Sequence, residues 1–464
     1  MKWCALFAVL GACAPPASHD ARRARVIATL ADDNYEWSRR DPGLVAMKLA
    51  KLQRGPYEWL RGTAALFWRD LMEPGGARSE TSFGDAASSR VLLVGDPHPE
   101  NAGTFRASDG TMTVDWNDFD ATGYGPFTGD LRRLGAGLAI IVRVGAPGDE
   151  AFCARVVDDA VGAYATAIGA LADGDRLEPT EMGAHPLLDK QLAKGLARGD
   201  VLFAVDELAP IRDGVRELVV GDLEPVGVDG VIEDRVLPVT DPDEAVMLRG
   251  AIARWSRGRL EPSAATVKLL ARRIGSGVAS YAALRYDAVL EGETLATADD
   301  RIIELKETRD GVIVRGTPQR AAAPWDSPSA RAVDTQRRLQ SRPDEDALLG
   351  VATAGGIALK IRDREAYQRG ISATDLEALA GGSAAKRQQL VELAAIYGRM
   401  LARAHGGART DDGVPGVSVI APRLAGRGEA FVAELTAAAL ADADQVQADH
   451  AAFDGVDLAA EVLP

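Results

Sequence analysis

Apolar residues recur along this chain with two different spacings, and each spacing predicts one kind of secondary structure. Residues 131–141 carry an apolar side chain every three or four positions, which puts one apolar face on a helix. Similar helical patterns cover much of residues 21–71 and the segments 152–171, 264–273, 331–340, 388–405 and 428–453. Short apolar runs bounded by turn residues instead predict strands at 91–94, 111–114, 288–290, 302–306 and 357–363.

Prolines interrupt the middle of the chain. Seven of them break the stretch from residue 173 to 262 into short pieces, and residues 218–238 alternate enough to suggest short strands. We therefore interpret residues 201–262 as a connector or accessory region. The length of 464 residues favours two domains or lobes.

The composition is that of an ordinary globular protein, with 47% hydrophobic and 26% charged residues, and the chain can bury a substantial core. The net charge of −15 argues against a general nucleic-acid binder, because neutralising phosphates is the main source of that affinity. We expect no nucleic-acid partner. A local basic pocket for a small anion is still allowed.

The first twenty residues have the layout of a bacterial secretory signal, with one lysine, a short apolar core and small residues before Cys13. Residues 10–13, Leu-Gly-Ala-Cys, resemble a lipobox, whose cysteine is lipidated. This predicts an exported protein that is lipid-anchored in the cell envelope and contacts the membrane only through that anchor. An ordinary signal cut near Ala14, or a mis-set start and a cytoplasmic protein, are the alternatives. The apolar run is too short for a spanning helix, and no later segment qualifies.

Cysteine and histidine spacing argues against two kinds of site. Cys4 would leave with the signal and Cys13 would carry lipid, so Cys153 stands alone in a helical pattern, where it behaves as a small hydrophobe. No disulfide framework follows from this. The five histidines include no pair at i and i+4, so a helical zinc site has no support.

Acidic residues gather where two predicted strands end. Asp96 follows the strand 91–94, and the strand 111–114 runs into Asp115, Asp118 and Asp120. If the two strands pair as a hairpin, Asp96, Asn101 and Asp115 meet in one place. Such oxygen ligands suit Mg²⁺, which is held by one or two carboxylates plus substrate phosphates. The alternative is that aspartate and asparagine gather in turns because they bond nearby backbone.

Motifs in this stretch resemble those of known families. Residues 95–101 read Gly-Asp-Pro-His-Pro-Glu-Asn, which resembles the catalytic loop of protein-kinase-like phosphotransferases, especially aminoglycoside and choline kinases. A closer resemblance is to the bacterial DUF2252 family of uncharacterised proteins. Its GDxHxxNFGTF, DxNDFDE and WDLKRL patterns correspond to residues 95–105, 115–120 and 129–134.

The resemblance implies an α+β, protein-kinase-like, two-lobed fold. It also implies Mg²⁺- and ATP-dependent transfer of a phosphoryl group to a substrate hydroxyl. In this interpretation Asp96 orients that hydroxyl or accepts its proton, while Asn101 and Asp115 hold Mg²⁺. Asp118 and Asp120 are further candidates for metal or substrate contacts.

Three accessory residues complete that half of the expected site. His98 shapes the loop by hydrogen bonding. Arg61 could reach a phosphate or a carboxylate bidentately, or form a structural salt bridge. Asp130 is expected to cap its own helix by accepting from backbone N–H groups and to brace the catalytic loop.

The nucleotide-binding half is expected much later in the chain. Residues 275–286 resemble the family's GxGSxG-x-x-RY loop, and Lys306 with Glu307 matches its KE pair. In the register set by Arg285 and Tyr286, two glycines of the pattern are replaced, by Ala279 and Ala282. A shifted register that uses Gly275, Gly277 and Ser280 keeps part of the loop. Glycine matters there because the backbone must approach phosphates closely.

The order of these parts is reversed relative to ordinary kinases. Catalytic and metal loops come first, and the Lys306 segment, the helix carrying Asp334 as its acidic partner and the helix ending at His405 come later. We therefore expect a circularly permuted kinase-like fold. The expected regions are 1–20 (signal and lipobox), 21–200 (catalytic loops), 201–262 (connector), 263–365 (nucleotide part) and 366–464 (helices completing the large lobe).

Three functions remain open from the sequence. The first is the phosphotransferase just described, with a nucleotide and an unknown small-molecule or protein substrate. The second is an envelope-anchored pseudokinase-like binding or scaffold protein, which the replaced glycines and the low ATP content outside the cytoplasm favour. The third is a metal-dependent hydrolase that uses the aspartate cluster alone.

Overall fold

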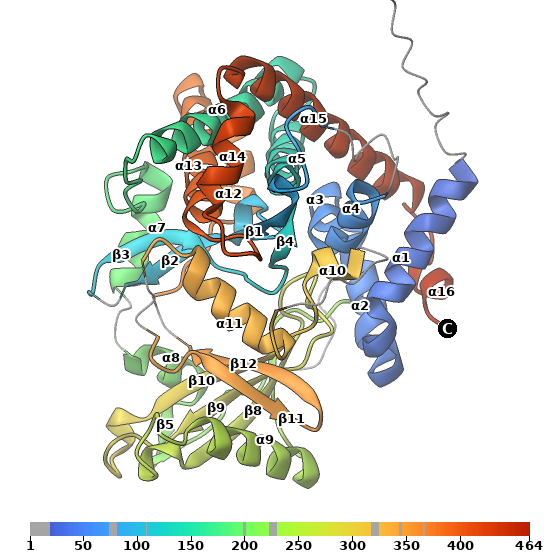
Figure 1. Cartoon of the computed structure of the whole chain (residues 1–464). Coiled ribbons are helices and arrows are strands. Elements are labelled where there is room, and N and C mark those ends of the chain that lie inside the picture. Colours follow the sequence, from blue (N-terminus) through green and yellow to red (C-terminus); the bar gives the residue numbers. More distant parts are fainter. Residues whose placement is uncertain are drawn as a thin grey trace, which may run out of the picture.

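The computed structural model describes residues 19–73, 81–107, 109–197, 201–221, 230–316, 324–342, 346–364 and 367–464. Within these ranges the protein mixes helices with small sheets, as expected for an α+β chain. Figure 1 shows a helical part at the top and an antiparallel sheet at the bottom, with helix α11 (Pro328–Leu339) between them.

Long helices packed around α5 form the core of the helical part. Helix α5 is buried from Phe127 to Val142 and contacts α6, α12 and α15. Gly398 in α13 lets that helix approach α6, because a Cβ there would lie 2.0 Å from the carbonyl oxygen of Ala160. The helices of this part are α3 (Pro56–Gly62), α4 (Ala64–Leu71), α5 (Phe127–Gly145), α6 (Glu150–Ala172), α7 (Pro186–Ala197), α12 (Ala373–Ala380), α13 (Ala384–Gly407), α14 (Gly416–Leu424) and α15 (Gly428–Ala452).

Two small sheets carry the acidic stretch of the chain. Strand β1 (Val91–Leu93) pairs with β4 (Gly123–Gly125), and β2 (Ala102–Arg106) pairs with β3 (Met112–Trp116). The hairpin expected between the strands at 91–94 and 111–114 is therefore wrong. The intervening segment forms its own strand, β2, which takes up the hydrogen bonds of β3.

The larger sheet is antiparallel and has six strands in the order β11-β12-β10-β9-β8-β7. One of its faces packs on α9 (Pro242–Trp255), where Leu248 and Ile252 meet Ile303 and Leu305 in one apolar cluster. The strands are β7 (Arg235–Pro238), β8 (Val267–Ile274), β9 (Arg285–Leu290), β10 (Arg301–Glu307), β11 (Gly350–Ala354) and β12 (Ile357–Asp363). Both β7 and α9 come from the range interpreted as a connector.

Residues 264–273 form a strand, not the helix that their pattern predicts. They lie mostly in β8, which has a partner on each side, β7 and β9. Pairing along both edges outweighs the helical preference of the leucine and arginine residues in this segment, since propensity is only a weak prior. Of the strands predicted over residues 218–238, the described residues contain β7 alone, and residues 222–229 lie outside the described ranges. The other predicted helices and strands named above are confirmed to within a few residues.

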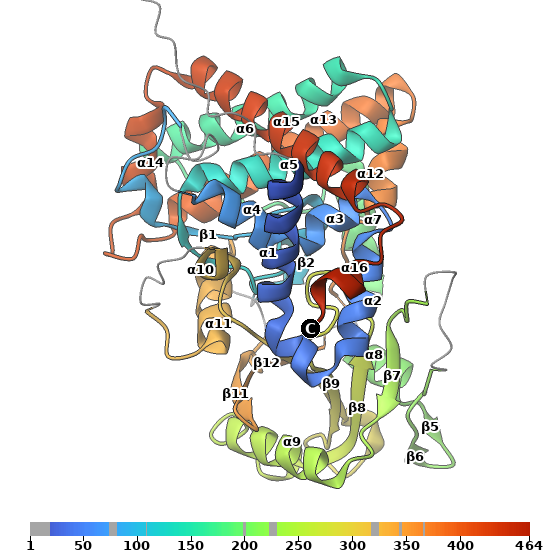
Figure 2. The same cartoon turned by 90° about the vertical axis from the view of Figure 1, so that its right-hand side faces the viewer.

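The N-terminal helices lie along one side of the molecule and reach from the helical part to the sheet (Figure 2). Helices α1 (His19–Arg40) and α2 (Pro42–Leu52) share an apolar cluster with α16 (Leu458–Val462) and with residues 274–283. The ends of the described chain thus pack against each other. The remaining elements are α8 (Val201–Leu208), α10 (Val312–Gly316), β5 (Ile211–Arg212), β6 (Val215–Arg216), η1 (Ser88–Arg90), η2 (Pro99–Asn101), η3 (Ser263–Ala265) and η4 (Thr297–Asp299).

Two sequence expectations concern the membrane and the cysteines. Among the described helices, none is both long enough and apolar enough to cross a bilayer. Cys13, the expected lipidation site, lies outside the described residues. Cys153 is a free, buried thiol in α6, and burial raises its pKa to about 11.

Candidate functional site

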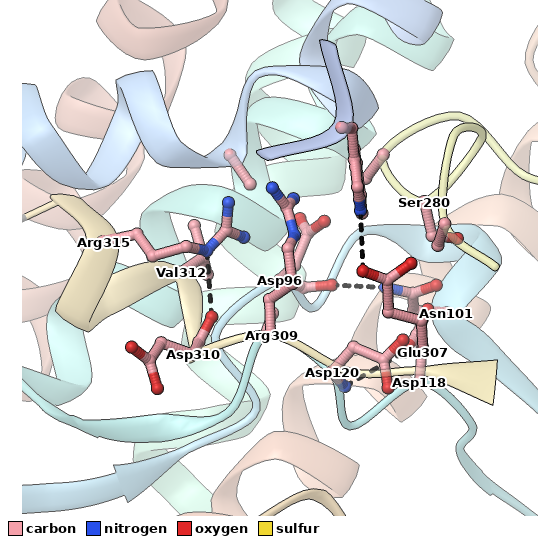
Figure 3. Close-up of a pocket in the computed structure, with 15 residues that line it drawn as sticks. Asp96, Asn101, Asp118, Asp120, Ser280, Glu307, Arg309, Asp310, Val312 and Arg315 are labelled. Atoms are coloured by element: carbon pink, nitrogen blue, oxygen red, sulfur yellow. Dashed lines mark hydrogen bonds between the residues drawn. The ribbon is translucent and has the colours of Figure 1, made fainter. Parts of the chain in front are cut away.

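A charged pocket lies where the acidic stretch, the end of β10 and the N-terminal helix α1 meet (Figure 3). Its free volume is about 70 Å³. Seven of its fifteen lining side chains are acidic or basic, and they come from segments that are far apart in the sequence. The charged and amide residues of the lining are Asp96, Asn101, Asp118, Asp120, Glu307, Arg309, Asp310 and Arg315.

A sharp turn after β1 presents Asp96 to this pocket. Gly95 has a positive φ of 85°, and a Cβ there would lie 2.3 Å from the carbonyl oxygen of Ala121. The turn is held by Asp130, whose carboxylate accepts hydrogen bonds from the backbone N–H groups of Val94 (2.8 Å) and Gly95 (3.0 Å). Asp130 therefore braces the loop, as expected.

Asp130 does not cap its own helix, and that part of the expectation is wrong. Helix α5 begins at Phe127, so Asp130 lies inside its first turn. Its carboxylate also lies 3.0 Å from Nε2 of the buried His405, whose Nδ1 lies 3.1 Å from the hydroxyl of Tyr164. A buried chain of polar groups therefore links the end of α13 to the Asp96 turn.

Within the described ranges, a hydrogen bond holds only one oxygen of the Asp96 carboxylate. Its Oδ1 accepts from Nε of the buried Arg133 at 2.7 Å, while Oδ2 lies 3.9 Å from Nε2 of His98. Burial raises the pKa of Asp96, and the positive charge of Arg133 opposes that rise without cancelling it. A carboxylate with a raised pKa and one loosely held oxygen suits proton acceptance.

Asn101 holds the loop beyond Asp96, whereas Nδ1 of His98 is buried with no hydrogen-bond partner within the described ranges, so the hydrogen bonding expected of its side chain is not seen there. The amide of Asn101, at the end of η2, donates to the carbonyl oxygen of Asp96 at 2.7 Å. His98 is buried and meets the ring of Tyr57 edge-on. Burial lowers the pKa of His98 well below its usual value, and the charges of Arg61 and Arg133 add to this, so its imidazole is neutral.

Asp118 and Asp120 face Lys306 at the end of β10. The Nζ of Lys306 lies 2.5 Å from Oδ2 of Asp120 and 3.6 Å from Oδ2 of Asp118. Burial alone would lower the pKa of Lys306, but these two carboxylates raise it instead. The positive charges of Lys306 and Lys360 lower the pKa of Asp118 to about 2 against the effect of burial.

Arg331 of α11 fixes the backbone of this acidic turn. Its guanidinium donates to the carbonyl oxygens of Phe119 (3.2 Å), Thr122 (2.8 Å) and Asp120 (2.7 Å). It also donates to the carbonyl oxygen of Arg309, beyond the end of β10 (2.8 Å). Sequence reasoning missed this residue, because an arginine in an amphipathic helix is usually on its solvent face.

Asp115 is not among the residues that line the pocket. Its Oδ2 accepts from the backbone N–H of Ser341 (2.7 Å) and from Arg403 (3.1 Å), and its Oδ1 accepts from the N–H of Trp116 (2.9 Å). The structure thus groups Asp96 and Asn101 with Asp118 and Asp120. Asp115 instead joins β3 to α13 and to the end of α11.

The loop between β8 and β9 contributes Ser280 to the pocket. Gly275 and Gly277 both have positive φ, of 81° and 77°, so glycine is needed at these two positions. The hydroxyl of Tyr281 donates to the carbonyl oxygen of Ile232 at 2.7 Å, and residues 278 and 281–283 pack against α1 and α2. Ala279 lies on the pocket side, whereas Ala282 is in the packed core.

Helix α1 closes the pocket from the side opposite to Asp96. Trp37 donates from Nε1 to Glu307 (3.1 Å), and Arg40 donates to the same carboxylate (2.6 Å). Glu307 also accepts from the backbone N–H of Leu284 (2.7 Å), at the end of the β8–β9 loop. The sequence pattern marked Glu307 only as the neighbour of Lys306. Its hydrogen bonds connect α1, the β8–β9 loop and β10. We call the contact of Trp37 and Arg40 with Glu307 the clasp.

Two accessory candidates make other contacts. Arg61 forms an ion pair of 2.6 Å with Glu100, in the catalytic-loop segment. Asp334 accepts from Nε1 of Trp325 (2.8 Å) and from Arg338 (3.3 Å). Within the described ranges no ion pair joins Asp334 to Lys306, whose carboxylate partners are Asp118 and Asp120.

The donors in the pocket fit a hard cation. Oδ1 of Asp120 is buried and has no hydrogen-bond partner within the described ranges. It lies in a lining that also contains Asp118 and Asn101, which bring further oxygen atoms. The described residues contain no cluster of three histidine, cysteine, aspartate or glutamate side chains that could hold a metal alone. Carboxylate and amide oxygens are ligands that Mg²⁺ takes in proteins, with waters and ligand phosphates as its other partners.

Comparison with known proteins identifies the family. Residues 40–208 and 250–455 match the family described as "uncharacterized protein conserved in bacteria (DUF2252)". The chain belongs to this family, as its motifs indicated. No curated protein and no solved structure matches the chain significantly.

Proposed function

We propose that this DUF2252 protein is a Mg²⁺- and ATP-dependent phosphotransferase that acts on a hydroxyl group. The observation that carries the proposal is the meeting of Lys306 with Asp118 and Asp120 at the pocket that Asp96 and Asn101 also line. Phosphoryl transfer needs positioning and charge neutralisation more than covalent chemistry by the protein. Two carboxylates and a base that line one pocket, with a lysine paired to those carboxylates, meet that need.

The arrangement of the sheet supports a kinase-like, two-lobed, circularly permuted fold. In protein kinases the phosphate-binding lysine is on the third strand, after a glycine-rich loop. Here β8, the loop with Gly275 and Gly277, β9 and β10 follow one another, and Lys306 is near the end of β10. The sheet comes after the acidic loops in the sequence yet lies against them in space, which is what a permuted order requires.

Asp96 is the base in this proposal. Arg133 fixes its Oδ1, so Oδ2 is the atom that accepts the proton of the substrate hydroxyl. A general base works best when its pKa approaches the working pH, and the raised pKa of Asp96 moves it in that direction.

Asp118, Asp120 and Asn101 are the residues that would hold Mg²⁺. The bound ion would neutralise negative charge on the phosphate oxygens. Lys306, already positively charged and placed beside both carboxylates, would contact the phosphate chain. Arg331 keeps the turn from Phe119 to Thr122 in the shape that these contacts require.

The pocket has room for an ion and a phosphoryl group, but not for a whole nucleotide. Its free volume of about 70 Å³ is well below the range of about 300–1,000 Å³ typical of ligand pockets. Nucleotide entry therefore requires the β8–β9 loop to move away from α1. The clasp made by Trp37, Arg40 and Glu307 is the contact that must yield.

The second candidate is an envelope-anchored pseudokinase-like binding protein. The specific observation in its favour is the loop itself, where Ala282 and Tyr281 pack into the core formed with α1 and α2. A loop held in this way contributes a binding surface without covering a nucleotide.

Calorimetric titration of the full chain with ATP, with and without Mg²⁺, separates the two candidates. We expect Mg²⁺-dependent binding that weakens at least about tenfold in Lys306→Met and Asp118→Asn, a change of about 1.4 kcal/mol. The matched control is Lys268→Met, which removes a sheet lysine paired with Glu291 and Asp300. Wild-type protein that binds no nucleotide overturns the phosphotransferase proposal. The pseudokinase candidate is favoured if the protein binds nucleotide but shows no ATP turnover, or only turnover that persists when Asp96 is replaced.

A further inference from the structure

The face of the large sheet that points away from α9 carries Val289 and Ile302, which pack on α8, and a group of charged side chains, most of which are buried. Side chains alternate between the faces of a strand, and Leu305 and Ile361 face α9, so their neighbours face the cleft. The strand register places these neighbours side by side, with Lys306 opposite both Arg285 and Lys360. We call this set the charged face: Arg273, Arg285, Asp287, Glu304, Lys306, Lys360, Arg362 and Arg364.

Arginine side chains already neutralise the two acids of the charged face. Glu304 pairs with Arg362 at 2.9 Å and with Arg285 at 3.9 Å. Asp287 pairs in the same way with Arg273 (2.7 Å) and Arg364 (3.2 Å). Because both acids are paired with arginines, neither Glu304 nor Asp287 serves as the counter-ion of Lys306 or Lys360. Lys306 is balanced from the other side of the cleft, by Asp120 and Asp118.

Lys360 is the exception. It is 4% exposed, and its Nζ lies 3.4 Å from the amide oxygen of Gln336 in α11. Across the described ranges no carboxylate lies within ion-pair distance of it, although it stands directly opposite Lys306. Like charges opposite each other destabilise a sheet. Burial lowers the pKa of Lys360, and among the described residues only the more distant carboxylates of Asp120 and Asp118 oppose that effect.

The neutral partner of Lys360 comes from the helix in which an acid was expected. Helix α11 directs Asp334 to Trp325 and Arg338 instead, and it offers Lys360 only the amide of Gln336. An amide positions an ammonium group without neutralising it. The positive charge of Lys360 thus remains available to a bound anion.

We propose that Lys306 and Lys360 together form a two-lysine subsite for a polyphosphate chain, with Lys360 contacting the phosphate next to the one held by Lys306. This inference rests on the proposed phosphotransferase function and names a residue that the resemblance does not. In the ligand-free protein the carboxylate of Asp120 forms an ion pair with Lys306. When Asp118 and Asp120 hold Mg²⁺, both lysines face the phosphates, and the like charges across β10 and β12 gain a common counter-ion.

Binding of Mg²⁺-ATP, Mg²⁺-tripolyphosphate and AMP to the full chain tests this subsite. Lys360→Met is expected to weaken both triphosphate ligands about ten- to hundredfold, the range for a hydrogen bond to a charged group. Its effect on AMP should stay within about twofold, because one phosphate needs one lysine. Lys360→Arg should recover part of the loss, and Lys268→Met should bind all three ligands like wild type.

Thermal unfolding provides a second readout that a general loss of folding would not produce. Removing the buried like charge should raise the unfolding temperature of ligand-free Lys360→Met, while the further increase caused by Mg²⁺-ATP should shrink. Equal weakening of AMP and ATP would overturn the inference. The inference would also be overturned if Lys360→Met bound triphosphates with wild-type affinity while Lys306→Met had lost that affinity. In that case the phosphotransferase proposal would still stand. A wild-type protein that binds none of the three ligands overturns both.

Discussion

Oδ2 of Asp120 lies 2.5 Å from Nζ of Lys306, while the other carboxylate oxygen of Asp120 is buried without a partner among the residues that the structure describes. One side chain therefore joins the acidic turn to the sheet and also leaves an oxygen available for a cation. Arg331 holds the backbone oxygen of the same residue at 2.7 Å. The position of Asp120 is thus fixed before any ligand arrives.

The first prediction distinguishes the two carboxylates that we propose as metal ligands, Asp118 and Asp120, from Asp115, which has structural contacts. Asp118→Asn and Asp120→Asn should weaken Mg²⁺ binding in the presence of ADP at least about tenfold, because each removes a charged oxygen ligand. Asp115→Asn should leave Mg²⁺ affinity within about twofold and lower the free energy of unfolding by about 1–3 kcal/mol, since it weakens the contacts to Ser341 and Arg403. Calorimetry and urea unfolding measure the two effects. If Asp115→Asn weakened Mg²⁺ binding and the other two variants did not, Asp115 would be the metal ligand instead.

The second prediction concerns Asp96 and pH. Asp96→Asn should lower kcat by about 10²–10⁴-fold, the usual contribution of a general base, and leave ATP affinity nearly unchanged. The base must be deprotonated to act, and burial raises its pKa. The acid limb of the wild-type kcat/KM profile should therefore lie above the ordinary aspartate value of 3.8. A profile that is flat down to pH 4 would contradict this role.

The third prediction assigns the shape of the acidic turn to Arg331. Arg331→Ala removes the hydrogen bonds to Phe119, Asp120 and Thr122 and should lower the free energy of unfolding by about 2–4 kcal/mol. It should also weaken Mg²⁺ binding, because the turn loses its fixed shape. Arg337→Ala, on the same helix with one bond to Leu349, is the matched control and should cost under about 1 kcal/mol. Equal effects of the two variants would rule out a special role for Arg331.

The fourth prediction follows from the lowered pKa of Asp118. Its pKa of about 2 in the folded protein lies below the ordinary value of 3.8, so its ion pairs stabilise the fold fully above about pH 4. That contribution should be lost as the pH falls through 2. Urea unfolding between pH 2 and 5 should show a smaller loss of stability on acidification in Lys306→Met than in wild type. Parallel pH dependence in the two proteins would contradict the coupling.

The fifth prediction addresses the anchor. Processing at Cys13 should be blocked by globomycin and by Cys13→Ala, with unprocessed protein accumulating in both cases. Metabolic labelling with a fatty acid followed by electrophoresis measures it. Unlabelled protein that is cleaved near Ala14 would point to an ordinary signal.

The sequence predicted that Asp96 and Asn101 lie close together, and the structure places both in the lining of one pocket; the sequence did not predict how the other acids are arranged around them. Motif spacing identified Asp96, Asn101 and Lys306, because turn and strand-end residues leave a local pattern. The choice of Asp118 and Asp120 over Asp115 depends on strand pairing: β3 pairs with β2, and Asp115 is taken up by Ser341 and Arg403. That pairing is a tertiary outcome with no local signal.

The residues that the sequence missed act across long distances in the chain. Arg331 binds carbonyl oxygens more than two hundred positions away, and Glu307 accepts from Trp37 and Arg40 at the other end of the chain. Lys360 was read only as part of a strand, since a lysine on a strand is usually exposed. Its significance depends on the register that sets it opposite Lys306.

The charged face also determines how the cleft can open. Separating the sheet from the acidic turn breaks ion pairs such as Lys306 to Asp120. Salt, which screens charges as they become exposed, should favour the open form. Moving the β8–β9 loop away from α1 also exposes the apolar side chains of Val278 and Tyr281, so opening should carry a heat-capacity change as well. Ionic strength and temperature should therefore both affect how readily the pocket opens.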